Sequence, residues 1–188
     1  LGMTLDPKGN NAALVIVDMQ VGVLANAWDT ARIINNVALA VSRARAEGVP
    51  VIWVQHSDEE LQQNSTLWQL VPELEPAEGE ARVHKHFNSS FEQTELEAVL
   101  NGLGVSHLVL AGAASNWCIR ATSHAALERG YDLTLISDGH TTETIEFEDG
   151  TVIEAATIVK ELNVAMTWLE YSKRKNTTIT AQELAFNA

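Results

Sequence analysis

The chain has 188 residues and a mass of 20.5 kDa, which is a usual size for one domain and enough to bury a substantial core. Its 12 basic and 25 acidic residues give a formal net charge of −13, which disfavours phosphate backbones and anionic membrane surfaces as partners. A single cysteine excludes an internal disulfide, and there is no signal-peptide pattern and no apolar run of about 20 residues. We therefore expect a cytoplasmic protein that binds neither nucleic acid nor membranes.

The first part of the chain alternates between strand and helix patterns. Residues 12–20, AALVIVDMQ, form a β-branched run that ends beside an acid, which is typical of a buried parallel strand. Apolar residues at helical spacing predict a helix over 30–48, and a second strand is expected over 49–56. The polar, acidic segment 57–80 predicts a long loop, with a short helix at 66–70.

The remaining chain repeats this alternation. We expect strands over 81–87, 106–113, 131–139 and 177–180, and helices over 94–104, 116–130 and 151–173. Such alternation with short connections builds right-handed βαβ units. The sequence therefore predicts an α/β fold, a three-layer α/β/α sandwich with a mainly parallel, Rossmann-like sheet of about six strands. We expect one domain over 1–188, with 1–11 as an N-terminal extension in which Leu1 and Gly2 are a cloning remnant.

Three residues suited to thiol chemistry lie at or just beyond predicted strand ends. These are Asp18, Lys85 and Cys118. Each alone has an ordinary interpretation, as a capping acid, a solvated cation or a small buried thiol. In a parallel sheet, however, working residues gather at the carboxyl ends of the strands. Cys118 also opens a predicted helix, where the dipole favours a thiolate, so the combination indicates an acid–base-assisted thiol reaction.

Four segments of the chain resemble the isochorismatase-like cysteine hydrolases. This superfamily includes nicotinamidases, N-carbamoylsarcosine amidase and isochorismatase. The segments read ALVIVDMQ, VHKHFNSSF, LVLAGAASNWCIRATSHAALERGYDLTLISDGHTT and TITAQELAF. The third is the most specific, because a strand, a glycine, a small pair and a helix-opening cysteine follow one another in that order.

The resemblance implies a role for each of the three residues. Asp18 matches the catalytic acid/base, Lys85 the catalytic lysine and Cys118 the nucleophile. It also implies a cis, non-proline peptide at Ala114–Ser115, with the backbone N–H groups of Ser115 and Cys118 forming an oxyanion hole. A homo-oligomer, either a dimer or a tetramer, is implied as well.

The metal-binding branch of the superfamily carries an Asp-x-His pair after its second strand and a further histidine downstream. Here the corresponding segment offers His56 and Asp58 in the reverse order, with no second histidine before His84. We expect no metal and no cofactor, and interpret His56 as a pocket-wall or hydrogen-bonding residue. In an extended segment, His84 and His86 would point away from the side that Lys85 occupies.

Further candidates for substrate binding lie near the three catalytic candidates. They are Gln20, Trp28, His56, Phe87 and Trp117, and core packing remains the alternative for the aromatic residues. The polar, acidic segment 140–152 could close over the site or face a neighbouring subunit. Acidic residues at the mouth would admit a cationic or neutral substrate more easily than a polyanion.

These observations favour a metal-independent cysteine hydrolase that cleaves a C–N bond of a small amide, ureide or lactam through a thioester. The alternative within the superfamily is an isochorismate-type vinyl ether hydrolase, which does not need the cysteine. A non-catalytic binding relative would be expected to have lost part of the triad, whereas Asp18, Lys85 and Cys118 are all present. A nucleotide-binding redox protein has little support, since no G-x-G-x-x-G follows the first strand.

Overall fold

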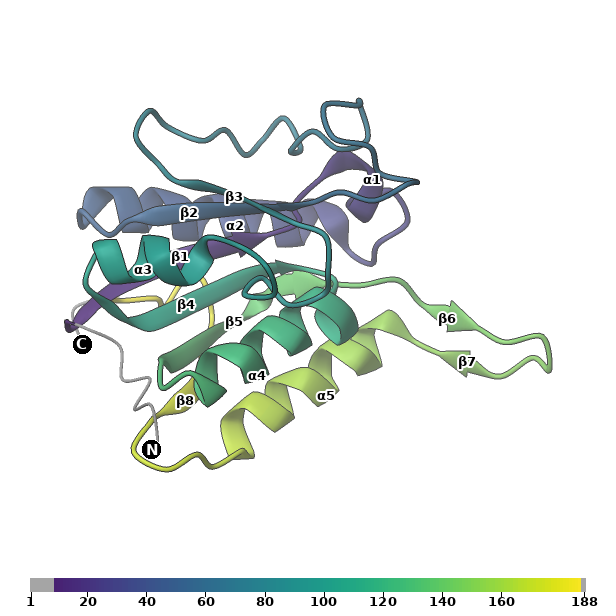
Figure 1. Cartoon of the computed structure of the whole chain (residues 1–188). Helices are drawn as coiled ribbons and strands as arrows, with labels where there is room; N and C mark the ends of the chain where they lie inside the picture. The colour runs from purple at the N-terminus through teal and green to yellow at the C-terminus, as the bar shows by residue number, and fades with distance from the viewer. Residues whose placement is uncertain (1–8, 187–188) are drawn as a thin grey trace.

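A six-stranded, wholly parallel sheet forms the centre of the computed structural model, which describes residues 9–186 (Figure 1). The strands lie in the order β3-β2-β1-β4-β5-β8. Their bounds are β1 Asn11–Val17, β2 Val51–His56, β3 Arg82–Lys85, β4 Val105–Ala113, β5 Asp132–Thr141 and β8 Asn176–Ile179. Leu1 and Gly2, with most of the expected N-terminal extension, lie outside the described residues.

Helices cover both faces of the sheet, which confirms the predicted three-layer sandwich. Helix α2 (Thr30–Ala46) packs on one face. The other face is covered by three helices, α3 (Leu96–Gly102), α4 (Arg120–Glu128) and α5 (Ala155–Trp168). None of the helices within residues 9–186 has the length and apolar character needed to cross a bilayer.

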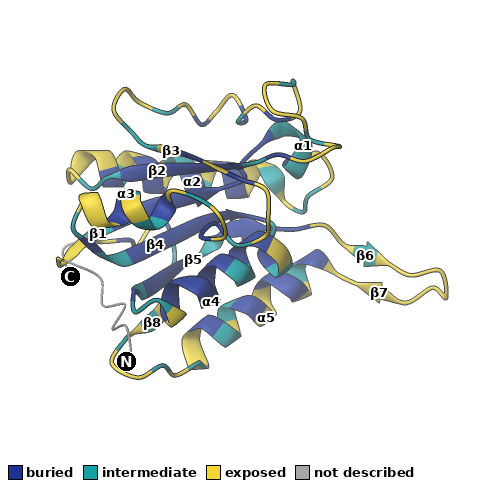
Figure 2. Ribbon diagram, viewed as in Figure 1, coloured by how far each residue is buried: buried dark blue, intermediate teal, exposed yellow. Residues whose placement is uncertain are grey.

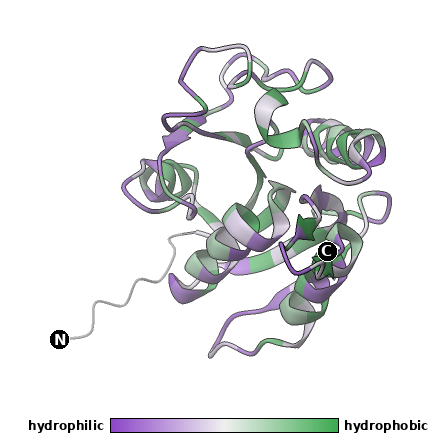
Figure 3. Cartoon of the chain, turned by 90° about the vertical axis from the view of Figure 1, so that its right-hand side faces the viewer, coloured by the Kyte–Doolittle hydropathy of each residue, from purple (hydrophilic) through white to green (hydrophobic). Residues whose placement is uncertain are grey.

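Side-chain alternation along the strands divides the core into two layers. In β1, Ala13 and Val15 face the α3–α5 side, whereas Leu14 and Ile16 pack under α2. Both sets are buried because each face of a parallel sheet is covered, so the strand reads as a continuous apolar run. Figure 2 shows the central strands β1, β2, β4 and β5 mostly buried, and Figure 3 shows hydrophobic residues in the centre with hydrophilic ones on the outward faces.

The long loop between β2 and β3 contains turns, so the helix predicted over 66–70 is wrong. Its backbone instead bonds to the segment after β1, where a short helix α1 (Val21–Leu24) begins. The N–H groups of Val21 and Gly22 donate to carbonyls of this loop, and the N–H of Val71 donates to Met19. These tertiary hydrogen bonds use backbone groups that a local helix would have needed.

The segment after β5 forms a projecting hairpin, which the sequence did not predict. Strands β6 (Ile145–Glu146) and β7 (Val152–Ile153) pair antiparallel and extend away from the body (Figure 1). The helix predicted over 151–173 is correspondingly shorter and occupies only Ala155–Trp168. We call this hairpin the arm. Its base stays against the carboxyl edge of the sheet, because β5 extends to Thr141 at that edge.

The strand order changes direction between β1 and β4. Strands β2 and β3 lie on one side of β1, and β4 pairs with β1 on its other side. Ligands of open α/β sheets bind at the carboxyl ends of the strands at such a switch point. Asp18 follows β1, and Cys118 follows β4 within the π-helical turn η1 (Ser115–Ile119), so both lie at this switch point.

Gly112 allows β1 and β4 to approach closely just before this edge. Its φ is +134°, and a Cβ there would collide with the carbonyl group of Val17.

We expect Gly112→Ala to lower the free energy of unfolding by at least about 2 kcal/mol, measured by urea denaturation. Gly102→Ala is the matched control, since a Cβ at Gly102 meets no atom within 4 Å. Equal stability of the two variants would contradict the assignment.

Candidate active site

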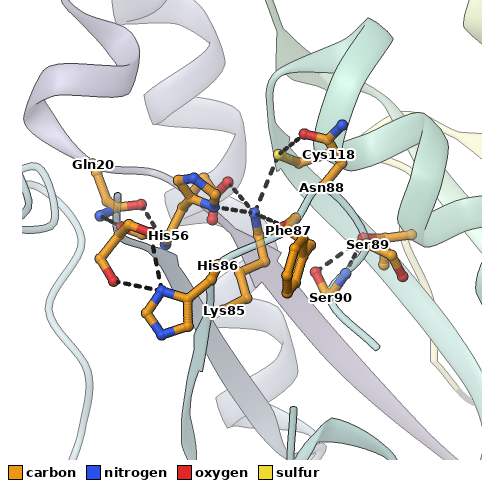
Figure 4. Close-up of polar contacts among 12 residues, drawn as sticks. Gln20, His56, Lys85, His86, Phe87, Asn88, Ser89, Ser90 and Cys118 are labelled. Carbon is orange, nitrogen blue, oxygen red and sulfur yellow. Dashed lines mark hydrogen bonds and ion pairs between the residues drawn. The ribbon is translucent and has the colours of Figure 1, made fainter. Parts of the chain in front are cut away.

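Asp18, Lys85 and Cys118 converge at the carboxyl edge of the sheet, and Figure 4 shows Lys85 reaching toward Cys118. The Lys85 Nζ lies 2.9 Å from Asp18 Oδ2 and 3.2 Å from Cys118 Sγ. All three side chains are buried, with 0%, 2% and 8% exposure for Lys85, Asp18 and Cys118. The structure therefore brings a carboxylate, an ammonium group and the only thiol of the chain into direct contact.

Lys85 reaches this contact from a strand that does not pair with β1. Strand β3 pairs with β2, so β1 lies two strands away, at roughly 10 Å by ordinary strand spacing. The long lysine side chain crosses the end of β2 to reach Asp18. Along β3, Val83 and Lys85 are buried whereas His84 is exposed, and His86 beyond the strand is exposed too, as alternation predicts.

The Lys85 ammonium has two further partners, His56 Nδ1 and the carbonyl oxygen of Phe87, each at 3.0 Å. The other ring nitrogen of His56 lies 3.1 Å from Asp58 Oδ2. An ionised carboxylate only accepts, so Nε2 carries the proton and Nδ1 accepts from Lys85. His56 and Asp58 are thus engaged with each other and with a cation, which does not suit a metal site. Within residues 9–186, no three His, Cys, Asp or Glu side chains converge as metal ligands.

Asp18 is held in an unusual backbone conformation at the end of β1. Its φ is 51°, in the left-handed region that residues with a Cβ rarely adopt, and its N–H donates to the Val54 carbonyl at 2.9 Å. One carboxylate oxygen accepts from Lys85, while Oδ1 is buried and has no hydrogen-bond partner in the described part of the chain. Oδ1 is therefore available to take up a proton.

Electrostatics keep the resting thiol protonated. Burial, followed by the Asp18 carboxylate, raises the pKa of Cys118 to about 12, and Lys85 only partly opposes this. Burial of Cys118 therefore opposes the thiolate that its place near a helix start was expected to favour. Burial also raises the pKa of Asp18, against the opposing charge of Lys85, which makes Asp18 a stronger base.

The turn that carries Cys118 differs from the prediction at one peptide bond. The cis peptide is Ala113–Ala114, one residue before the predicted Ala114–Ser115. Strand β4 ends at Ala113 and η1 begins at Ser115, so the cis bond is the first peptide bond after the strand rather than the one that opens η1. The N–H groups of Ala114 and Ser115 donate to no backbone carbonyl within residues 9–186, and the oxyanion hole at Ser115 and Cys118 stays a prediction.

A buried hydrogen-bond chain that the sequence did not reveal supports this turn. The Asn163 amide donates to the Ser137 carbonyl, which leaves its oxygen to accept from His140 Nε2 at 2.8 Å. His140 Nδ1 then accepts from Ser115 Oγ at 2.7 Å. These residues come from η1, β5 and α5, so no local spacing connects them. Burial lowers the pKa of His140 to about 4, and the imidazole is neutral.

The predicted substrate-binding residues have different surroundings. The Gln20 amide is buried and bonds to the backbone of His56 and Trp68, so it braces the loop after β2. Phe87 is exposed beside its carbonyl contact with Lys85. Trp28 and Trp117 each line a cavity near this edge, and Trp117 is 57% exposed. Asn88, which the sequence did not single out, lies with its Oδ1 4.0 Å from Cys118 Sγ.

The chain is similar to known proteins over most of its length. The family model of the isochorismatase domain matches residues 12–168. The isochorismatase family protein YddQ of Bacillus subtilis is 32% identical over 146 residues, which cover 73% of this chain and 81% of that protein. A streptothricin hydrolase of Streptomyces noursei is 32% identical over 145 residues, covering 73% of this chain and 57% of that protein.

A solved structure gives the same result for the fold. The crystal structure of an isochorismatase from Pseudomonas putida superposes with a TM-score of 0.83 at 27% sequence identity. The match covers 98% of this chain and all of that one, 100%. The parallel sheet and its helical layers are therefore shared over almost the whole chain.

The electrostatics of the site predict opposite effects of Asp18→Asn and Lys85→Met on the rate at which Cys118 is alkylated. Removing the carboxylate lowers the pKa of Cys118, so alkylation of the thiol by iodoacetamide at about pH 8 should accelerate by roughly tenfold. Lys85→Met removes the stabilising cation, and its alkylation should become slower than in the parent protein. The only cysteine is Cys118, so labelled mass reports it directly. Slower alkylation of Asp18→Asn would contradict this electrostatic arrangement.

The depressed pKa of His140 predicts a loss of stability in mild acid. Unfolding restores an ordinary histidine pKa near 6.5. Between that value and the folded pKa of about 4, the unfolded chain binds a proton at His140 that the folded chain does not bind, so lowering the pH favours unfolding. From about pH 7.5 to about pH 5 this group should lower the free energy of unfolding by about 2 kcal/mol. In urea denaturation over the same pH range, the free energy of unfolding of His140→Gln should fall by about 2 kcal/mol less than that of the parent protein. His86→Gln, at an exposed histidine, should keep the parent's pH dependence.

Proposed function

This chain belongs to the isochorismatase family, and on that premise we propose that it is a metal-independent cysteine hydrolase cleaving a C–N bond of a small amide, ureide or lactam. The observation that carries the proposal is the contact of Lys85 Nζ with both Asp18 and Cys118 in a buried site. A thiol, a base and a cation in contact are the groups that covalent acyl transfer requires. The match to a streptothricin hydrolase supports the hydrolase assignment.

Attack begins with proton transfer from the thiol. Asp18 takes the Sγ proton, for which its unpartnered Oδ1 and its raised pKa suit it. The thiolate forms only as it attacks the carbonyl carbon, since the resting thiol has a pKa of about 12. As negative charge leaves Asp18 and develops on sulfur, Lys85 lies within reach of both atoms and stabilises each in turn.

Collapse of the tetrahedral intermediate breaks the C–N bond. Asp18 returns the proton to the leaving nitrogen, which departs as an amine or ammonia, and a thioester remains on Cys118. The backbone N–H groups of Ser115 and Cys118 are proposed to hold the oxyanion. Asp18 then deprotonates a water that attacks the thioester, the C–S bond breaks, and the thiol regains its proton.

The supporting residues fit this scheme without a metal or another cofactor. His56 and Asp58 orient the lysine, and Gln20 holds the backbone at the end of β2. An isochorismate-type vinyl ether hydrolase is the second candidate, and it would act on a dianion. The cavity beside the nucleophile turn has no Lys, Arg or His among its lining residues, which favours the amide reaction. Assembly as a homo-oligomer stays a prediction, which the mass of the protein in solution would test.

The test is ammonia release from a panel of small amides, ureides and lactams. Cys118→Ser should lower kcat by at least about 10³-fold, and Asp18→Asn should do nearly as much. Rapid acid quenching should trap an acyl adduct on Cys118, visible by mass spectrometry, in the parent protein only. A Cys118→Ala variant that keeps activity would exclude the thioester and favour the vinyl ether reaction. Glu148→Gln, on the exposed arm, is the control for handling and folding.

A further inference from the structure

A cavity of about 460 Å³ opens beside the turn that carries the nucleophile. Its floor is Ala113 and Ala114, which end β4 and lead into η1, and the exposed ring of Trp117 borders it. Small residues around α1 form one wall, and the base of the arm, residues 142–146, forms the other. Ala114 belongs to the same turn as Cys118, because its carbonyl accepts from the N–H groups of Trp117 and Ile119 on either side of the nucleophile.

The charge of this cavity is one-sided. Glu143 and Glu146 line it, and its lining residues include no Lys, Arg or His. Neither carboxylate forms an ion pair or a side-chain hydrogen bond with any residue in the range 9–186. Two carboxylates with no cation of their own thus face a space that is otherwise lined by methyl groups, Thr side chains and an indole ring.

The aromatic side of the cavity suits the same kind of ligand. An indole face attracts ammonium and guanidinium groups through its quadrupole. A smaller cavity of about 300 Å³ adjoins through Glu143 and Thr144, and Trp28 lines it. The Arg32 guanidinium lies 5.6 Å from the centre of the Trp28 ring but is already paired with Asp29. Glu143 therefore lines two neighbouring cavities, each bordered by an indole, without a cation to neutralise it.

We propose that this cavity binds a cationic group of the substrate, an ammonium or guanidinium, between Trp117 and the carboxylates of Glu143 and Glu146. The proposal rests on the proposed function, because it places the scissile carbonyl at Cys118 and the cation in the adjoining cavity. The expected substrates are therefore small amides, ureides or lactams that carry a positive charge. The arm base then acts in specificity, since it supplies both carboxylates.

The test uses the thiol as a reporter of charge, without any substrate. Methanethiosulfonate reagents react with a thiolate to form a mixed disulfide, and methanesulfinate leaves. Three such reagents are compared, carrying a trimethylammonioethyl, a methyl and a sulfonatoethyl group. The ratio of the cationic to the anionic rate constant is independent of how much thiolate is present, because that fraction is common to both. The same ratio for 2-mercaptoethanol corrects for the reagents themselves.

We expect the corrected ratio to exceed about tenfold in low salt, and to fall as salt screens the carboxylates. Glu143→Gln and Glu146→Gln should each lower it by about threefold, and the double variant by about tenfold. Glu148→Gln is the matched control, since it removes the same charge from the same arm but does not line the cavity. All three side chains are exposed, so these substitutions leave the core intact.

Two outcomes would overturn the proposal. One is a corrected ratio near unity. The other is an equal effect of Glu148→Gln and Glu143→Gln, which would assign the preference to the net charge of the whole protein. Failure of the proposed function looks different, because the parent would then release no ammonia from any amide while the charge preference at Cys118 persisted. For an active amidase, 5-aminopentanamide should exceed pentanamide in kcat/KM, and glutaramate should be poorest.

Discussion

Burial of the Lys85 ammonium against the Asp18 carboxylate is the interaction on which the rest of the site depends. Neither charge can leave water without a partner, since the effective penalty is several kcal/mol for each ion. Their separation of 2.9 Å offsets that penalty, and His56 and the Phe87 carbonyl satisfy more of the ammonium's donors. Removing either ion would leave the other buried and uncompensated. The pair links the ends of β1 and β3, two strands that do not pair with each other.

The same pair explains how a protonated thiol can serve as a nucleophile. The Asp18 carboxylate that raises the pKa of Cys118 is, in the proposed mechanism, also the base that receives its proton. Transfer moves one negative charge from oxygen to sulfur, and Lys85 contacts both atoms, so the total charge around the ammonium does not change. The site therefore needs little reorganisation during attack, which is the condition for strong electrostatic stabilisation. A resting thiol also resists oxidation better than a thiolate.

Two features from distant parts of the chain adjoin the turn that carries Cys118, a buried hydrogen-bond chain and a cavity. Beneath the nucleophile, buried polar groups from η1, β5 and α5 are joined through His140 and fix the turn. Above it, α1, η1 and the base of the arm enclose the cavity proposed to take the substrate's cation. The buried hydrogen bonds hold the turn that carries Cys118, and the cavity is proposed to select the substrate by its charge.

The sequence by itself determined the fold class and the three central residues. Buried parallel strands appear as continuous apolar runs before Asp18 and Cys118, and Lys85 ends a short strand of alternating pattern. All three could therefore be assigned to the carboxyl edge of one sheet. Only the tertiary structure decided the protonation of the thiol, since burial sets that pKa and no local pattern reports it. It also decided the cis peptide at Ala113–Ala114, the arm, and the contacts of Ser115 with His140 and of His56 with Lys85. These features join segments far apart in the chain, and hydrogen bonding and desolvation depend on distances in space that local sequence spacing does not encode.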